Sequence, residues 1–184
     1  MPAYKSYPKT STLAFTIGKG FQSQILAKFN ERRKTGECCD LKLKVDGKVL
    51  FAHKAVLIER SEYFNRMLTT GFKETGSTEI DYSGTFSDLN VLNQVVSFIY
   101  TGKIVINEND IEDILQASSL FLIDDLKNIC AEYLLSNLSL DNCCYTLYLA
   151  DMFNFEKLVK LCELMISAHF GAVSYTHLTL PTKA

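Results

Sequence analysis

The chain has 184 residues, 47% of them hydrophobic, which is enough to bury a substantial core in one or two domains. The formal net charge is −2, and the one basic cluster, Lys28 with Arg32 to Lys34, is shorter than the positive face that nucleic acid requires, so we expect no nucleic-acid binding. The apolar runs are shorter than the roughly 20 residues that a bilayer span requires, so we expect no membrane insertion. The N-terminus lacks the apolar segment of a signal peptide, so we expect a cytoplasmic location, with the nucleus as the other compartment considered.

The N-terminal part is expected to consist of an arm, residues 1–20, and a helix from about Phe21 to Arg33. Apolar residues share one face of this helix, ahead of the first strand of the domain. They are Phe21, Ile25, Leu26 and Phe29. Such a stripe must be buried somewhere. The spacing alone leaves two alternatives open, packing on the same domain or packing on a second copy of the chain.

Residues 40–57 form the most informative stretch, because they are typical of a hairpin that runs directly into a helix. Hydrophobic residues alternate with lysines over 41–45, which is the period of a half-buried strand. Asp46-Gly47 then predicts a tight turn, since glycine adopts the positive φ that such turns need. Val49 to Phe51 is expected to form the return strand.

The chain from residue 109 onward is expected to be helical. Asn109-Asp110 offers N-cap side chains, and the apolar stripes that follow have helical spacing. These stripes comprise Ile111, Ile114, Leu115 and Leu122, then Leu126, Ile129, Cys130, Tyr133 and Leu134, then Leu147, Ala150 and Phe153 with Leu158, Leu161, Cys162, Met165 and Ile166. No stripe continues after Phe170, so we expect residues 171–184 to be an atypical tail that reflects truncation or a sequence from outside the natural reading frame.

The six cysteines give no metal-binding pattern, because none stands in a Cys-x-x-Cys pair and the three histidines are scattered. We therefore expect no metal and no cofactor. Cys130 and Cys162 lie on apolar stripes and are interpreted as small hydrophobic residues. The adjacent pairs Cys38-Cys39 and Cys143-Cys144 leave a redox role open, although adjacency alone does not lower a thiol pKa.

The segment from Asp40 to Leu57 resembles the core signature of the BTB/POZ family, in which an Asp opens the first strand and a Phe-x-Ala-His-Lys-x-Val-Leu run follows the second. Ser61 to Leu68 and Phe72 to Glu74 resemble the family's next helix and loop. Phe98 to Ile104 resembles its helix-to-strand corner, where a Thr-Gly pair ends the helix. The resemblance implies an α+β fold, a helix cluster flanked by a small sheet, over residues 21–135.

The same resemblance implies how the domain associates. In this family the helix before the first strand packs against its copy in a second subunit, which favours a homodimer through Phe21, Ile25, Leu26 and Phe29. It also implies that Asp40, His53 and Lys54 lie close together at a groove shared by the dimer. These three residues are expected to be structural or recognition groups rather than catalysts.

The stretch from Asn137 to Asp151 is similar to the start of the BACK segment, or 3-box, of kelch-like proteins, and residues 136–170 are assigned to it. This similarity implies a dimeric, non-catalytic adaptor that bridges a cullin-3 ubiquitin ligase to a substrate. In kelch-like relatives six kelch blades hold the substrate, and no such domain is expected in this chain. The substrate itself is unknown.

The resemblance implies a cullin surface formed by Leu92, Gln94, Tyr100 and Leu140. Cullin-binding relatives often carry a hydrophobic-x-Glu triplet before the corner, and the matching window here is Leu92-Asn93-Gln94. A charge-assisted hydrogen bond would therefore be weakened. The alternative function is a transcriptional regulator, in which the same dimer recruits a corepressor and zinc fingers follow. The similarity of residues 138–151 to the 3-box favours the ligase adaptor.

Overall fold

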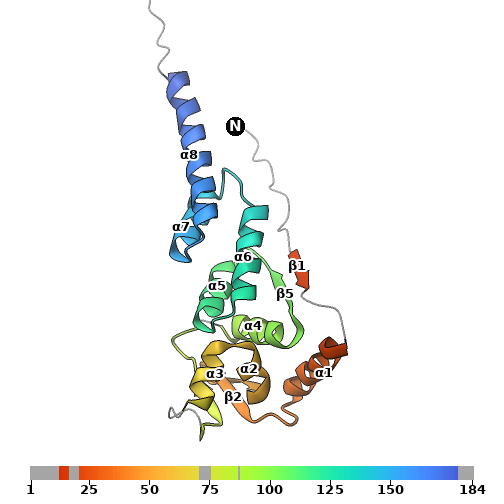
Figure 1. The fold of residues 1–184 in the computed structure, drawn as a ribbon. Helices are drawn as coiled ribbons and strands as arrows, with labels where there is room; N and C mark the ends of the chain where they lie inside the picture. The colour runs from red at the N-terminus through yellow and green to blue at the C-terminus, as the bar shows by residue number, and fades with distance from the viewer. Residues whose placement is uncertain (1–12, 17–20, 71–75, 87, 178–184) are drawn as a thin grey trace, which may run out of the picture. The chain divides into compact units, whose positions relative to one another are not determined.

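The computed structural model describes residues 13–16, 21–70, 76–86 and 88–177, and the side chains at 13–16, 21–23 and 170–177 are outside that description (Figure 1). The chain forms two compact units that divide between Cys130 and Ala131. The first combines helices with two small sheets, and the second is helical. The expected α+β class is confirmed.

The predicted hairpin is confirmed. Strands β2 (Leu41–Val45) and β3 (Lys48–Ala52) pair antiparallel, and Asp46 and Gly47 both have positive φ, 48° and 78°, as a tight two-residue turn demands. The side chains of Leu41, Leu43 and Val45 are almost completely buried. The short strand β4 (Glu79–Asp81) adds parallel to β2, which gives the order β3-β2-β4.

Four helices accompany this sheet: α1 (Phe21–Thr35), α2 (Lys54–Arg60), α3 (Glu62–Thr69) and α4 (Leu89–Thr101). Helix α4 lies in the core and is packed by α1, α2, α5 and β3. It ends as the sequence predicts, because Gly102 adopts a left-handed conformation with φ 64° and its N–H bonds to the carbonyl of Phe98. Strand β5 (Lys103–Ile106) then pairs antiparallel with β1 (Leu13–Thr16).

Helices α5 (Ile111–Leu120) and α6 (Asp124–Ser136) follow. Asp110 occupies the N-cap position of α5, but its carboxylate accepts hydrogen bonds from the side chains of Asn107, at 2.6 Å, and Gln94, at 3.2 Å, instead of capping the helix. Asp110 thus stands at the predicted N-cap position, but the predicted hydrogen bond from its side chain to the helix is absent. An aromatic cluster around Phe121 completes this core with Phe64, Tyr63, Tyr82 and Phe86.

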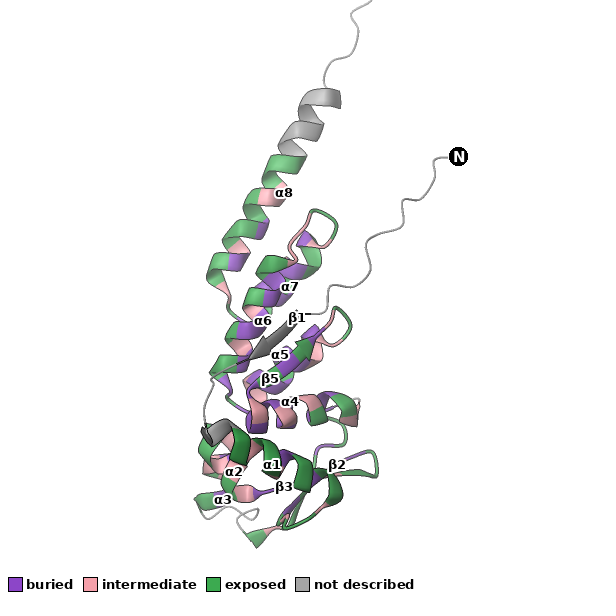
Figure 2. Cartoon of the chain, turned by 90° about the vertical axis from the view of Figure 1, so that its right-hand side faces the viewer, coloured by how far each residue is buried: buried purple, intermediate pink, exposed green. Residues whose placement is uncertain are grey.

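The second unit contains α7 (Cys143–Met152) and α8 (Glu156–His177), which pack against each other. Of the predicted stripes, Ala150, Phe153, Leu158 and Cys162 are buried as expected, whereas Leu147 is half-buried and Leu161 is 37% exposed. Leu149, which the predicted stripes do not include, is completely buried. Helix α8 is exposed over much of its length (Figure 2). It continues to His177, past the point where the apolar stripe of the sequence ends.

Candidate protein-interaction site

An open groove of about 460 Å³ lies between α1 and α2. Apolar side chains form much of its wall, and charged groups stand beside them. Its lining residues are Leu26, Phe29, Cys38, Asp40, His53, Ala55, Val56, Glu59 and Arg60. A concave surface that combines apolar area with a few placed polar groups is typical of a binding site.

Helix α1 contributes part of its predicted stripe to this groove. Leu26 and Phe29 are half-buried and line it, and the Phe29 ring meets the His53 ring edge to face at a centroid distance of 5.0 Å. Ile25 remains 44% exposed. The side chain of Phe21 lies outside the described residues. The domain therefore covers the described stripe only in part, which leaves apolar surface for a partner.

Asp40, His53 and Lys54 are brought together, as the family resemblance implies. The Asp40 carboxylate accepts a hydrogen bond from the backbone N–H of Lys54, at 2.8 Å. Lys54 is the first residue of α2, and the side chain of the N-cap residue His53 makes no capping bond. Asp40, from the start of the hairpin, thus caps α2 in its place, with the carboxylate at the positive end of the helix. The Asp40 side chain is itself exposed.

His53 is only 6% exposed, and the Tyr100 hydroxyl contacts it at two atoms. The hydroxyl accepts a hydrogen bond from the His53 backbone N–H at 2.8 Å and lies 2.9 Å from Nδ1 of the same residue. Nε2 lies 3.7 Å from the Cys39 sulfur. Burial raises the pKa of Cys39, and Asp40 adds to this, so the thiol does not have the lowered pKa of a reactive cysteine.

Arg33 is buried beside the Tyr100 ring. It is 1% exposed, its Nε donates to Asn30 Oδ1 at 2.8 Å, and its Nη2 donates to Asn93 and Ser97 of α4. The guanidinium lies 5.4 Å from the centre of the Tyr100 ring. Burial lowers the pKa of Arg33. No ion pair of Arg33 occurs among the residues that the structure describes.

The residues expected to bind cullin-3 are placed very differently from one another. Leu92 and Tyr100 are 0% and 1% exposed, so this structure does not present them to a partner, and their contact role stays a prediction. Their apolar character serves the core of the first unit. Gln94 is half-buried and bonded to Asp110. Leu140, in the second unit, is 51% exposed and available to a partner.

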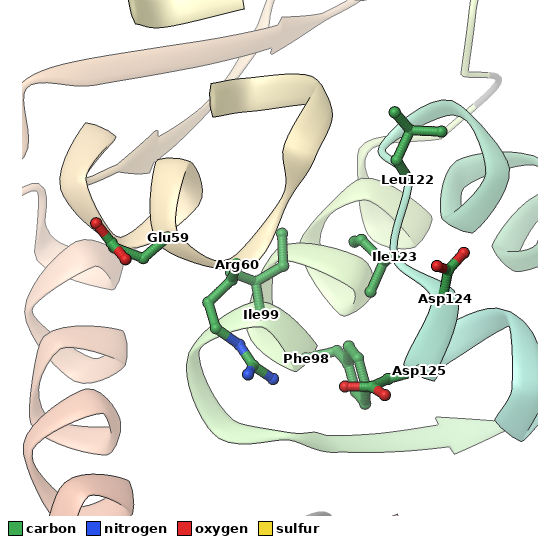
Figure 3. Close-up of a pocket in the computed structure, with 8 residues that line it drawn as sticks. All are labelled: Glu59, Arg60, Phe98, Ile99, Leu122, Ile123, Asp124 and Asp125. Carbon is green, nitrogen blue, oxygen red and sulfur yellow. The ribbon is translucent and has the colours of Figure 1, made fainter. Parts of the chain in front are cut away.

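A second, smaller hollow of about 190 Å³ adjoins the end of α2 (Figure 3). Arg60 reaches into it from α2, while Asp124 and Asp125 stand at the start of α6. Leu122, in the preceding turn, has a positive φ of 53° and is 48% exposed. Arg60 forms no ion pair with either aspartate in the described part of the chain.

Within the described residues, no group of three or more His, Cys, Asp or Glu side chains is arranged to hold a metal ion. None of the helices formed by these residues has the length and apolar character that crossing a membrane requires.

Sequence reasoning missed the buried role of Arg33 and the bond between Tyr100 and His53. A signal for Arg33 was present, because it follows Leu26 by seven residues and Phe29 by four and so shares their helical face. The contact between Tyr100 and His53 joins residues 47 positions apart, and no local pattern reveals it.

The fold and the groove define a protein-interaction domain, and the comparisons with known proteins say which one. The BTB/POZ domain family model matches residues 29–138. The chain therefore belongs to the BTB/POZ domain family. The solved BTB domain of zebrafish PATZ1 is 30% identical, with a TM-score of 0.55 over 62% of this chain and 92% of that one.

Curated relatives carry kelch-like names. Kelch-like protein 36 of Bos taurus is 33% identical over 152 residues, which is 83% of this chain and 24% of that protein. Kelch-like protein 17 of Homo sapiens is 34% identical over 155 residues, 82% of this chain and 24% of that protein. The chain thus spans about a quarter of the length of these relatives.

Proposed function

We propose that this chain is a dimeric, non-catalytic adaptor that brings a substrate to a cullin-3 ubiquitin ligase. Other subunits would carry out ubiquitin transfer, and this chain would supply an interface that raises the effective concentration of the substrate near them. The substrate would be held by a domain outside this chain. No catalytic side chain is required for such a role.

One observation carries the proposal. The family model ends at residue 138, but similarity to kelch-like proteins covers 82% to 85% of the chain and so includes residues outside that match. The second unit, with its helical hairpin of α7 and α8, corresponds to the part that resembles the 3-box. An interaction domain of a zinc-finger regulator would not need that segment.

The proposed dimer would form through α1. Ile25 is 44% exposed on a helix whose neighbouring apolar residues line the groove, so contact with a second copy would remove it from water. Ile25→Asp would place a charge in an apolar contact and should convert dimers to monomers at micromolar concentration. Light scattering coupled to gel filtration measures this directly.

The matched control is Gln24→Asp. Gln24 is exposed on the same helix and does not line the groove, so this variant should remain dimeric. A wild-type chain that is monomeric at micromolar concentration would overturn the dimer.

Capture of cullin-3 by the immobilised wild-type chain tests the adaptor role. Retention of the purified N-terminal domain of cullin-3 supports it. If that domain is not retained while a corepressor peptide is, the transcriptional alternative replaces it.

A further inference from the structure

Glu59 and Arg60 form an adjacent pair of opposite charges in the last turn of α2, and both line the groove between α1 and α2. Both are exposed. Figure 3 shows their charged ends pointing in different directions from the helix. Neither residue forms an ion pair or a side-chain hydrogen bond in the described structure. Among the described residues, the groove thus has a positive and a negative group beside its apolar wall, neither of them in an ion pair.

The charged groups around this pair do not neutralise it within the chain. Asp40 also lines the groove, but its carboxylate already accepts the N–H of Lys54. Asp124 and Asp125 face Arg60 across the smaller hollow without an ion pair. If the apolar neighbours Leu26 and Phe29 were covered by a partner, Glu59 and Arg60 would lose water, and each would then need an opposite charge from that partner.

A second copy of the chain meets this need through symmetry. In a two-fold contact the same patch is used on both subunits, so a residue that contacts a different residue of the partner is contacted in return by its copy. We propose that Glu59 of each subunit pairs with Arg60 of the other across the α1–α2 groove, and that this pairing makes the surface selective for a copy of itself. The inference rests on the dimer of the proposed function and adds the residues that select the partner.

Charge exchange tests the pairing. Glu59→Arg gives a patch with two positive groups, and Arg60→Glu gives a patch with two negative groups. Each variant alone should dimerise at least about tenfold more weakly than the wild type, because like charges then face each other. An equimolar mixture of the two variants should form a heterodimer with affinity within about threefold of the wild type, since opposite charges are restored. Sedimentation velocity measures the dissociation constants of the wild type and of each variant, and a fluorescent label on one variant gives that of the heterodimer.

The salt dependence and a control variant separate this pairing from a general charge effect. The difference between each variant and the wild type should shrink at high salt, where exposed charges are screened. Glu108→Arg changes an exposed charge that does not line the groove and should leave dimerisation unchanged. Circular dichroism checks folding; if a charge reversal unfolds the chain, Glu59→Gln and Arg60→Gln replace it and should each weaken the dimer by a smaller factor.

The outcomes distinguish the pairing of Glu59 with Arg60 from the proposed dimer itself. A dimeric wild type whose affinity is unchanged in both reversals, or a mixture no tighter than the separate variants, overturns the pairing and leaves the dimer intact. A monomeric wild type overturns the pairing and the proposed dimer together.

Discussion

The hydroxyl of Tyr100 joins α4 to the start of α2 by meeting His53 at two atoms, the backbone N–H at 2.8 Å and Nδ1 at 2.9 Å. Both residues are buried, so water cannot replace either bond. Tyr100 thus fixes the position of His53, and through His53 the edge of the groove against which Phe29 packs.

Tyr100→Phe should lower the free energy of unfolding by about 1 to 3 kcal/mol. The ring volume is preserved, but the buried N–H of His53 loses its acceptor. Chemical denaturation monitored by circular dichroism measures the loss. Tyr148→Phe, at a tyrosine that is 50% exposed, is the matched control and should stay within about 0.5 kcal/mol of the wild type. Equal stability of the two variants would show that the hydroxyl contributes little.

Tyr100 also predicts that the stability of the wild type and of Tyr100→Phe will depend differently on pH above about 10. Burial raises the pKa of Tyr100 to about 12, above the tyrosine value of 10.0. Between these values the folded chain keeps a proton that the unfolded chain has lost, so the wild type loses this part of its stability as the pH rises from about 10 to about 12. Tyr100→Phe has no such proton, and its stability relative to the wild type should improve over that interval.

The cap that Asp40 provides for α2 predicts that two substitutions of Asp40 will lower the stability by different amounts. Asp40→Ala removes the acceptor of the Lys54 N–H and should cost about 1 kcal/mol of stability. Asp40→Asn keeps an oxygen but loses the charge at the positive end of the helix, so its cost should be smaller. The melting temperature should fall from the wild type to Asp40→Asn and further to Asp40→Ala. If Asp40→Ala has the same melting temperature as the wild type, the hydrogen bond from Lys54 to Asp40 does not stabilise the domain.

Arg33 and Arg32 are neighbours with opposite environments, which makes them a matched pair. Arg33→Lys should lower the free energy of unfolding by about 1 to 2 kcal/mol, because an ammonium cannot reach Asn30, Asn93 and Ser97 in the planar geometry of a guanidinium. Arg32→Lys, at an exposed position, should change it by less than about 0.5 kcal/mol. Similar losses in both variants would contradict the buried role of Arg33.

Gln94→Glu would restore the triplet expected in cullin-binding relatives, but the structure predicts a cost. The Gln94 amide donates to the Asp110 carboxylate at 3.2 Å, so a glutamate there would set two carboxylates against each other. Stability at neutral pH should fall by about 1 kcal/mol, the size of a lost hydrogen bond. Thermal melts at pH 7 test this, and Gln94→Ala reports the loss of the bond without the added charge.

The sequence predicted best where the signal was local. The alternation over residues 41–45, the Asp46-Gly47 turn and the left-handed Gly102 each express a preference that neighbouring residues determine, and the structure has all three. The candidate site was harder to predict from the sequence, because its geometry depends on contacts between residues that are distant in sequence. The family resemblance implies a contact role for Tyr100 and Leu92, whereas the packing of α4 in the core buries both side chains.

Binding of cullin-3 tests the central claim most directly, and Leu140 offers the variant to use. Leu140→Asp changes an exposed apolar residue in the segment that resembles the 3-box, and Leu164→Asp, at a residue 68% exposed on α8, is its control. Calorimetric titration with the N-terminal domain of cullin-3 should show saturable binding of one cullin per chain, weakened about tenfold or more by Leu140→Asp and unchanged by Leu164→Asp. No measurable heat or complex with the folded, dimeric wild type would contradict the proposal that this chain is a cullin-3 adaptor.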